Sequence, residues 1–263
     1  THDEDKSKLK WLDTFLGDLY LDEINLEVIR QIKNAKLKEA SKSTVNRYLA
    51  LLRSILRRAR DEWEWIDKAP KVRLFQESNE RVRALTVSQA KILLSELPEH
   101  QRMTVLFALA TGLRQSNIIK MEWSQIDLEN HFAYVNAGDF KNRKAHGIPL
   151  NDAALQVLQC QFKRHHTRVF TYKGEPFSSA NTAAWKKALK RAGIENFRWH
   201  DLRHTWATWL RKAGTPTHEL QRLGGWKTLA MVERYAHIQP DDLEYAASRL
   251  NAVFVGYDLV TPK

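Results

Sequence analysis

The segment HDLRHTWAT, residues 200–208, has residue types and a spacing that suit phosphate chemistry. On a helix, His200, Arg203 and His204 occupy positions i, i+3 and i+4, so they share one face. A guanidinium group binds two phosphate oxygens at once, and a histidine takes or gives a proton near pH 7. An ordinary polar surface helix has the same pattern, so the segment alone leaves both interpretations open.

The two histidines also lie close to the HExxH zinc pattern, with Asp201 in place of the glutamate. A zinc site is the weaker interpretation, because Arg203 inside it would repel the cation. No carboxylate-rich motif that would supply a third ligand follows. We therefore expect no metal at these residues.

Four residues elsewhere complete a set that fits phosphoryl transfer. Arg114 lies in ATGLRQSNI, Lys141 in a predicted hairpin, Trp226 after two glycines and Tyr235 in ERYAH. With residues 200–208 they supply two arginines, a lysine, a histidine and a tyrosine, and no carboxylate pair for magnesium. This set matches metal-free chemistry through a covalent tyrosine ester, in which the arginines stabilise a five-coordinate phosphate.

Four strings in this chain resemble the motifs of the tyrosine recombinases, the phage integrases in particular. The strings are ATGLRQSNI, FKNRKAHGIPL, HDLRHTWAT and LGGWKTLAMVERYAH. They follow the family's order and spacing over about residues 84–240. The helical pattern at 8–65 is similar to the family's core-binding domain. Four ordered motifs are far more specific than any one of them.

The resemblance implies a role for each matching residue. Arg114 and Arg203 look like the catalytic arginines, and His200 with Arg203 like the family's His-x-x-Arg pair. His200 would assist proton transfer at Tyr235, the expected nucleophile. Lys141 looks like the hairpin lysine that acts as general acid, with Lys144 as the nearby alternative.

Two further positions need comment. The family usually has a second histidine where this chain has Trp226. Some members carry tryptophan there, and its indole N–H still donates a hydrogen bond to phosphate. For His204 we expect a structural role beside the site, with a catalytic role as the alternative. Tyr245 and Tyr257 lack the motif and are expected to pack.

Composition agrees with a nucleic-acid partner. The 263 residues carry 42 Lys and Arg against 31 Asp and Glu, a net charge of +11. Such a chain is drawn to polyanions, although charge alone does not separate DNA from other partners. One cysteine excludes an internal disulfide, and no apolar run is long enough to span a bilayer. No signal peptide begins the sequence, so we expect the cytoplasm of a bacterial host, on the nucleoid. Because the sequence does not begin with Met, we expect a fragment or a processed form of a longer chain.

Periodicity predicts a mainly α protein with a small antiparallel sheet near 130–150, an α+β fold. Thr86 to Gln89 form a capping box that opens a helix. Helices are expected at 8–20, 25–35, 43–63, 86–97, 100–110, 152–165, 179–192, 201–213, 217–223, 228–235 and 240–250.

We expect four parts along the chain. Residues 1–67 form a helical core DNA-binding domain, 68–82 an exposed linker, and 83–250 the catalytic domain. Residues 251–263 form a tail that docks on a neighbouring protomer. The resemblance implies that the two domains make a C-shaped clamp around duplex DNA.

The predicted helix at 43–63 has one apolar stripe, and its other face carries Asn46, Arg47, Arg53 and Arg57. Almost all the charge on that face is positive. We expect these four residues to contact the DNA backbone, and a solvated charged face is the alternative.

The resulting interpretation is a site-specific recombinase that integrates or excises a phage or mobile element through a 3′-phosphotyrosyl intermediate. It would need neither ATP nor metal. Its expected partners are double-stranded DNA attachment sites, three further copies of itself in a tetramer, and accessory DNA-bending proteins. The alternatives are a type IB topoisomerase, which reseals the same strand, and a non-catalytic DNA-binding regulator on the same scaffold.

Overall fold

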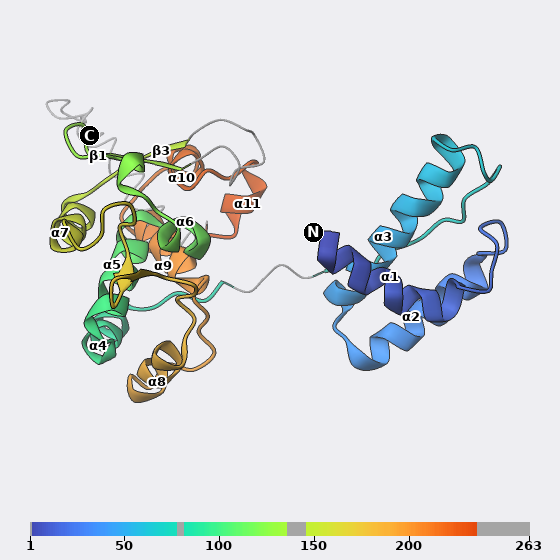
Figure 1. Cartoon of the computed structure of the whole chain (residues 1–263), viewed down its shortest axis with the longest axis horizontal. Coiled ribbons are helices and arrows are strands. Elements are labelled where there is room, and N and C mark those ends of the chain that lie inside the picture. The colour runs from blue at the N-terminus through green and yellow to red at the C-terminus, as the bar shows by residue number, and fades with distance from the viewer. Residues whose placement is uncertain (1, 78–81, 136–145, 236–263) are drawn as a thin grey trace, which may run out of the picture. The chain divides into compact units, whose positions relative to one another are not determined.

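The computed structural model describes residues 2–77, 82–135 and 146–235 (Figure 1). The chain divides into two compact units, Thr1–Asn79 and Glu80–Lys263. Some predicted features lie outside the described residues: Lys141 with its alternative Lys144, the helix at 240–250 with Tyr245, and the tail at 251–263 with Tyr257.

The first unit is built from three helices, α1 (His2–Leu16), α2 (Leu26–Glu39) and α3 (Lys42–Asp61). The side chains of Asn25 and Ser41 cap α2 and α3 by accepting backbone N–H groups that the helices leave unpaired. The apolar stripe predicted for α3 is buried against the other two helices. The core of this unit includes Leu12, Ile29, Ile32, Val45, Leu49, Leu52 and Leu56.

The segment after α3 continues to pack on this core. Val72 is buried and Phe75 packs against the cluster, although both fall within the linker that was expected to be exposed. Asn46 holds the segment, because its Nδ2 donates to the Phe75 carbonyl at 2.9 Å and its Oδ1 accepts the Phe75 N–H at 2.7 Å. The sequence gives no periodic signal here, since the segment is extended and only single residues are buried.

The second unit is mainly helical around the central helix α5 (Glu99–Thr111), which is mostly buried. Helix α5 packs against α7 (Asp152–Gln161) and α9 (Asp201–Lys212). Helix α4 (Val87–Glu96) begins with the predicted capping box and packs against α5 and α8 (Ala183–Arg191). Buried aromatic residues fill the space between these helices, among them Phe107, Phe170, Trp185, Phe197 and Trp199.

The predicted antiparallel sheet is present and small. Strand β2 (Phe132–Val135) pairs on one side with β1 (Ile126–Asp127) and on the other with β3 (His146–Pro149). Ala133, Val135 and Ile148 point into the core, which gives the alternation expected of a half-buried sheet. A second hairpin, β4 (Thr171–Tyr172) with β5 (Glu175–Pro176), was not predicted.

Short elements complete the second unit. They are α6 (Gln115–Ile119), the 3₁₀ turn η1 (Trp123–Gln125), α10 (Thr217–Gly224) and α11 (Ala230–Glu233).

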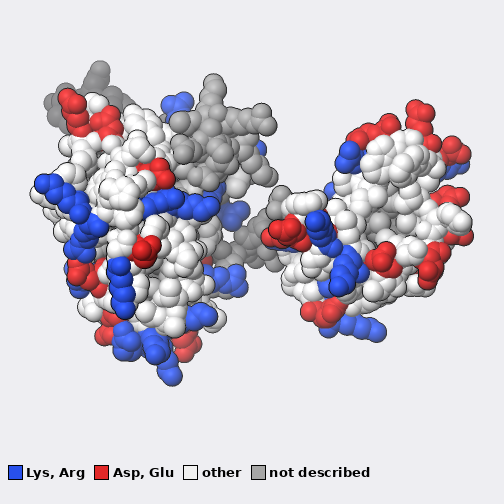
Figure 2. All heavy atoms as spheres, in the orientation of Figure 1, with Lys and Arg blue, Asp and Glu red and all other residues white. Residues whose placement is uncertain are grey.

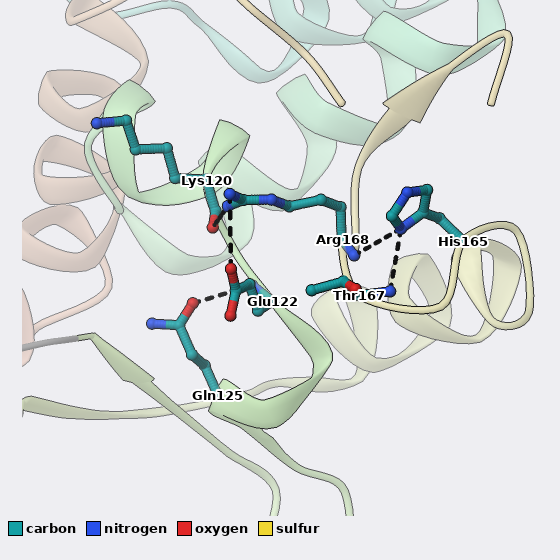
Figure 3. Close-up of polar contacts among 6 residues, drawn as sticks. All are labelled: Lys120, Glu122, Gln125, His165, Thr167 and Arg168. Carbon is teal, nitrogen blue, oxygen red and sulfur yellow. Dashed lines mark hydrogen bonds and ion pairs between the residues drawn. The ribbon is translucent and has the colours of Figure 1, made fainter. Parts of the chain in front are cut away.

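A polar network anchors the segment between α6 and β1 (Figure 3). Arg168 pairs with Glu122 at 3.5 Å and donates to the Lys120 carbonyl. Glu122 donates its N–H to Gln125, and His165 Nδ1 accepts the Arg168 N–H at 2.9 Å. These bonds fix the end of α6 relative to the core.

Figure 2 displays one face of each unit, with Lys and Arg side chains interspersed with Asp and Glu. Among the described residues, no helix combines the length and apolar character needed to cross a membrane.

Candidate active site

Helix α9 positions the first group of candidate residues. His200 is its N-cap residue, and Arg203 and His204 lie in the first turn. Asp201 fixes the start of the helix, because its Oδ2 accepts the Arg198 N–H at 2.8 Å. Trp199 and Leu202 anchor this turn in the core. The predicted shared face is thus held on a helix that is buried along its first two turns.

Arg203 is buried and held from three sides. Its Nη1 donates to the Gly112 carbonyl at 2.7 Å, and its Nη2 donates to the Gly224 carbonyl. The guanidinium carbon lies 4.1 Å from the centre of the Trp226 ring, a cation–π contact. A guanidinium has five N–H donors, so further donors remain for a ligand.

Glycine is required at both carbonyls that hold Arg203. Gly112 ends α5 with a φ of 66°, and a Cβ there would overlap the Trp206 ring. A Cβ on Gly224 would overlap the Trp226 ring. The Trp206 and Trp226 rings stack at 6.1 Å between centres. Each indole therefore packs against one of the two glycine backbones and against the other indole.

Arg114 joins this site from a different part of the chain. It follows the turn at Gly112 and is the N-cap residue of α6. The pKa of Arg203 is lowered to about 9, first by burial and then by the positive charge of Arg114. Loss of surrounding water lowers the pKa of His200, and Arg203 and Arg114 lower it further. Three groups that carry or accept positive charge are therefore close together, and a bound anion would relieve their repulsion.

Tyr235 lies in the same part of the site, close enough to Arg203 for its charge to act on the phenol. It follows α11, is only 6% exposed, and its hydroxyl lies 2.6 Å from His204 Nδ1. The Trp226 ring covers it at 5.6 Å between centres. Burial raises the pKa of Tyr235, while Arg203 and Arg234 lower it. The phenol therefore keeps its proton at pH 7.

The sequence profile of the phage integrase family matches residues 75–241. This chain belongs to the phage integrase family. An integrase of Salmonella phage P22 is 43% identical over 233 residues, which cover 83% of this chain and 60% of that protein. A shufflon-specific DNA recombinase of Escherichia coli is 31% identical, over 83% of this chain and 59% of that protein. The chain thus spans about three fifths of the length of these relatives.

Solved integrase structures share the fold. The Tn1549 transposon integrase in complex with transposon right end DNA has a TM-score of 0.76 at 20% identity, over 94% of this chain and 92% of that chain. A lambda integrase dimer bound to a COC′ core site has a TM-score of 0.71 at 23% identity, over 87% and 88% of the two chains. The mainly helical fold with small antiparallel sheets is that of the phage integrases.

The structure gathers five of the predicted site residues in one place in this integrase-family chain: Arg114, His200, Arg203, Trp226 and Tyr235. His200 was expected to assist proton transfer at Tyr235, and that role stays a prediction. The structure places His204, for which a catalytic role was the alternative, against the Tyr235 hydroxyl, and His200 is exposed one turn earlier. The position of His204, on the same helix face as His200 and Arg203, was the sequence signal that it lies at the site. The histidines alone could not show which ring reaches the phenol, because that depends on where α11 ends.

The four predicted DNA-contact residues divide into two kinds. Arg47 and Arg57 are exposed and Arg53 is partly exposed on α3. Asn46 is buried, and its amide is bonded to Phe75, so it supports the fold of the first unit. Among the described residues, no group of three His, Cys, Asp or Glu side chains gathers as a metal site would require.

Proposed function

We propose that this chain cuts and rejoins DNA strands as a site-specific tyrosine recombinase, with Tyr235 as the nucleophile. The observation that carries the proposal is the contact of the Trp226 ring with both the Arg203 guanidinium and the Tyr235 ring, which holds the buried phenol close to that cation. A buried phenol close to a guanidinium, with Arg114 adding positive charge at that guanidinium, suits attack on a phosphodiester whose negative charge the arginines neutralise.

In the proposed cleavage step, the Tyr235 hydroxyl gives its proton to a neighbouring histidine and its oxygen forms a bond to phosphorus. The bond from phosphorus to the 5′-oxygen breaks at the same time. Arg114 and Arg203 bind the two non-bridging oxygens, and the exposed His200 and the Trp226 indole N–H donate further hydrogen bonds to the phosphate. The ester that results keeps the energy of the broken bond, so no ATP is consumed. A 5′-hydroxyl of a partner duplex then attacks the ester and releases Tyr235.

We assign the proton for the leaving 5′-oxygen to Lys141, in the segment between β2 and β3. Support comes from the flanking strand. His146 begins β3, and its Nε2 lies 3.3 Å from the Leu223 carbonyl oxygen, next to the Gly224 carbonyl that holds Arg203. The first residue of β3 therefore lies close to the carbonyl that holds Arg203. Lys144 is the alternative donor.

The proposed substrate is a double-stranded DNA attachment site held by both units as a C-shaped clamp. Residues 80–263 carry 26 Lys and Arg against 17 Asp and Glu, so most of the excess charge lies in the unit that holds Tyr235. Arg47, Arg53 and Arg57 are proposed to contact the phosphate backbone from the first unit. Two synapsed duplexes would hold four protomers, with accessory bending proteins, on the host nucleoid for integration or excision.

A covalent adduct tests this function. The substrates are linear duplexes from the DNA that flanks the element, and each carries a nick that lets the cleaved fragment diffuse away. They are incubated with the chain in excess chelator, and the reaction is then denatured with SDS. The proposal expects an adduct on the 3′ end and strand transfer to a second duplex. Relaxation of a supercoiled plasmid in a parallel assay, without strand transfer between duplexes, would favour a type IB topoisomerase. Binding without any adduct would favour a regulator.

A further inference from the structure

The contact between His204 and Tyr235 joins a base directly to the proposed nucleophile. His204 Nδ1 lies 2.6 Å from the Tyr235 hydroxyl oxygen, and the two rings are 5.6 Å apart between centres. Both side chains are buried. A buried hydroxyl needs a hydrogen-bond partner, and a backbone carbonyl would satisfy that need without any chemistry. An imidazole differs because it can keep the proton that it accepts.

His204 is neutral in this site. Its pKa is lowered to about 4, by burial first and then by His200. Arg203 and Arg234 also lower the pKa of His204, whereas Asp201 raises it. A neutral imidazole carries one N–H, so Nδ1 is the acceptor when the phenol donates to it. An incoming DNA phosphate would bring negative charge close to the ring and raise its pKa, so the ring becomes a better base when substrate binds.

We propose that His204 accepts the phenolic proton of Tyr235 through Nδ1 as that oxygen attacks the phosphate, and returns it when the strand is rejoined. The proposal rests on the function proposed above. The proton leaves the Tyr235 oxygen as the bond to phosphorus forms, and the imidazole becomes an imidazolium. On rejoining, the bond between phosphorus and the Tyr235 oxygen breaks, and the imidazolium gives the proton back. The cycle consumes no proton and needs no co-reactant.

His200 is the natural comparison, because it has the same chemistry one turn away. The His200 and His204 rings lie 5.1 Å apart and nearly perpendicular. His200 is exposed, whereas the His204 ring is buried against the Tyr235 hydroxyl. The geometry therefore divides the work, with His200 toward the phosphate and His204 toward the phenol.

A fluorinated tyrosine at position 235 tests proton acceptance, since its phenol ionises more readily and needs less help from a base. The variants are His204→Asn, which keeps a hydrogen-bonding group near Nδ1 but takes up no proton, and His200→Asn as the matched control. With ordinary tyrosine, His204→Asn should slow adduct formation by ~10²–10⁴-fold, the usual effect of losing acid–base catalysis. With fluorotyrosine this deficit should shrink below about tenfold, while the His200→Asn deficit should persist.

The outcomes separate a base from a structural partner. A His204→Asn deficit that is equally large with both tyrosines would mean that His204 only positions the ring, and would overturn the proposal. Cleavage at the parent rate by His204→Asn would overturn it too. Thermal melting shows whether the His204→Asn variant folds. If that variant does not fold, His204→Gln is used in its place.

A measurement without DNA separates this proposal from the function on which it rests. In the parent chain labelled with ¹⁵N-histidine, the Nδ1 resonance of His204 should shift when Tyr235→Phe removes the hydroxyl. An unchanged resonance would contradict the contact itself. A shifted resonance together with no adduct on any flanking duplex would keep the contact, and would refute the recombinase function and its proton step.

Discussion

Replacing Arg203 by lysine separates the charge at this position from the geometry of its hydrogen bonds. The guanidinium spans two backbone carbonyls, those of Gly112 and Gly224, and stacks on Trp226. A lysine ammonium is a compact group that cannot span both carbonyls and also reach a phosphate oxygen. Removal of one donor from a transition-state site lowers the rate by about 10²–10³-fold. We expect Arg203→Lys to cleave DNA more slowly by that factor.

The fold should respond to Arg203→Lys by a smaller amount. One buried carbonyl would lose its donor, and such an unpaired group costs about 1–3 kcal/mol. Arg211→Lys is the matched control, because Arg211 lies on the same helix and donates to the Thr215 carbonyl at 2.5 Å. The assay is the rate of adduct formation at saturating DNA, with melting measured in parallel. Cleavage by Arg203→Lys within tenfold of Arg211→Lys would refute the reasoning that the two carbonyls aim this arginine.

Two further predictions follow from the contacts of α3 and α9. Asn46→Ala should destabilise the first unit by about 1–3 kcal/mol, because its hydrogen bonds to Phe75 are lost. Arg57→Ala should leave stability unchanged. It should reduce the slope of log binding constant against log salt concentration by about one, the loss of one phosphate contact. Denaturant unfolding and salt titrations measure both, and the reverse pattern would contradict the assignment. The pKa of His204 is about 4 in the folded unit, below its ordinary 6.5, so the unfolded chain binds more protons between these values. Stability of the parent should therefore fall by up to about 3 kcal/mol relative to His204→Asn as the pH drops from 7 to 4, and parallel pH curves for the two proteins would exclude this shift.

Long periodic segments and motif residues could be predicted from the sequence. The stripe on α3 and the capping box at Thr86 are local patterns, and the structure contains both. Gly112, two residues before Arg114, ends α5 with positive φ, a conformation for which glycine is the usual residue. Each of these features depends on neighbours within a few residues, which the sequence displays directly.

Features that depend on contacts distant in sequence were missed. The burial of Asn46 depends on a segment 29 residues later, which no helical period reveals. The partner of Tyr235 depends on where α11 ends relative to α9, a separation of 31 residues. The strands β4 and β5 have two residues each, too short for alternation to show. Their turn at Lys173 and Gly174 has positive φ at both residues, and that pair was the available signal.

The most direct test of the account is the identity of the residue that becomes joined to DNA. Trapped adduct from the parent chain is digested with protease and nuclease, and the peptide that carries the nucleotide is sequenced by mass spectrometry. We expect the modification on Tyr235, and we expect Tyr235→Phe to bind the same DNA with unchanged affinity but to form no adduct. A Tyr235→Phe chain that still becomes joined to DNA, or a nucleotide carried by any other residue, would contradict it.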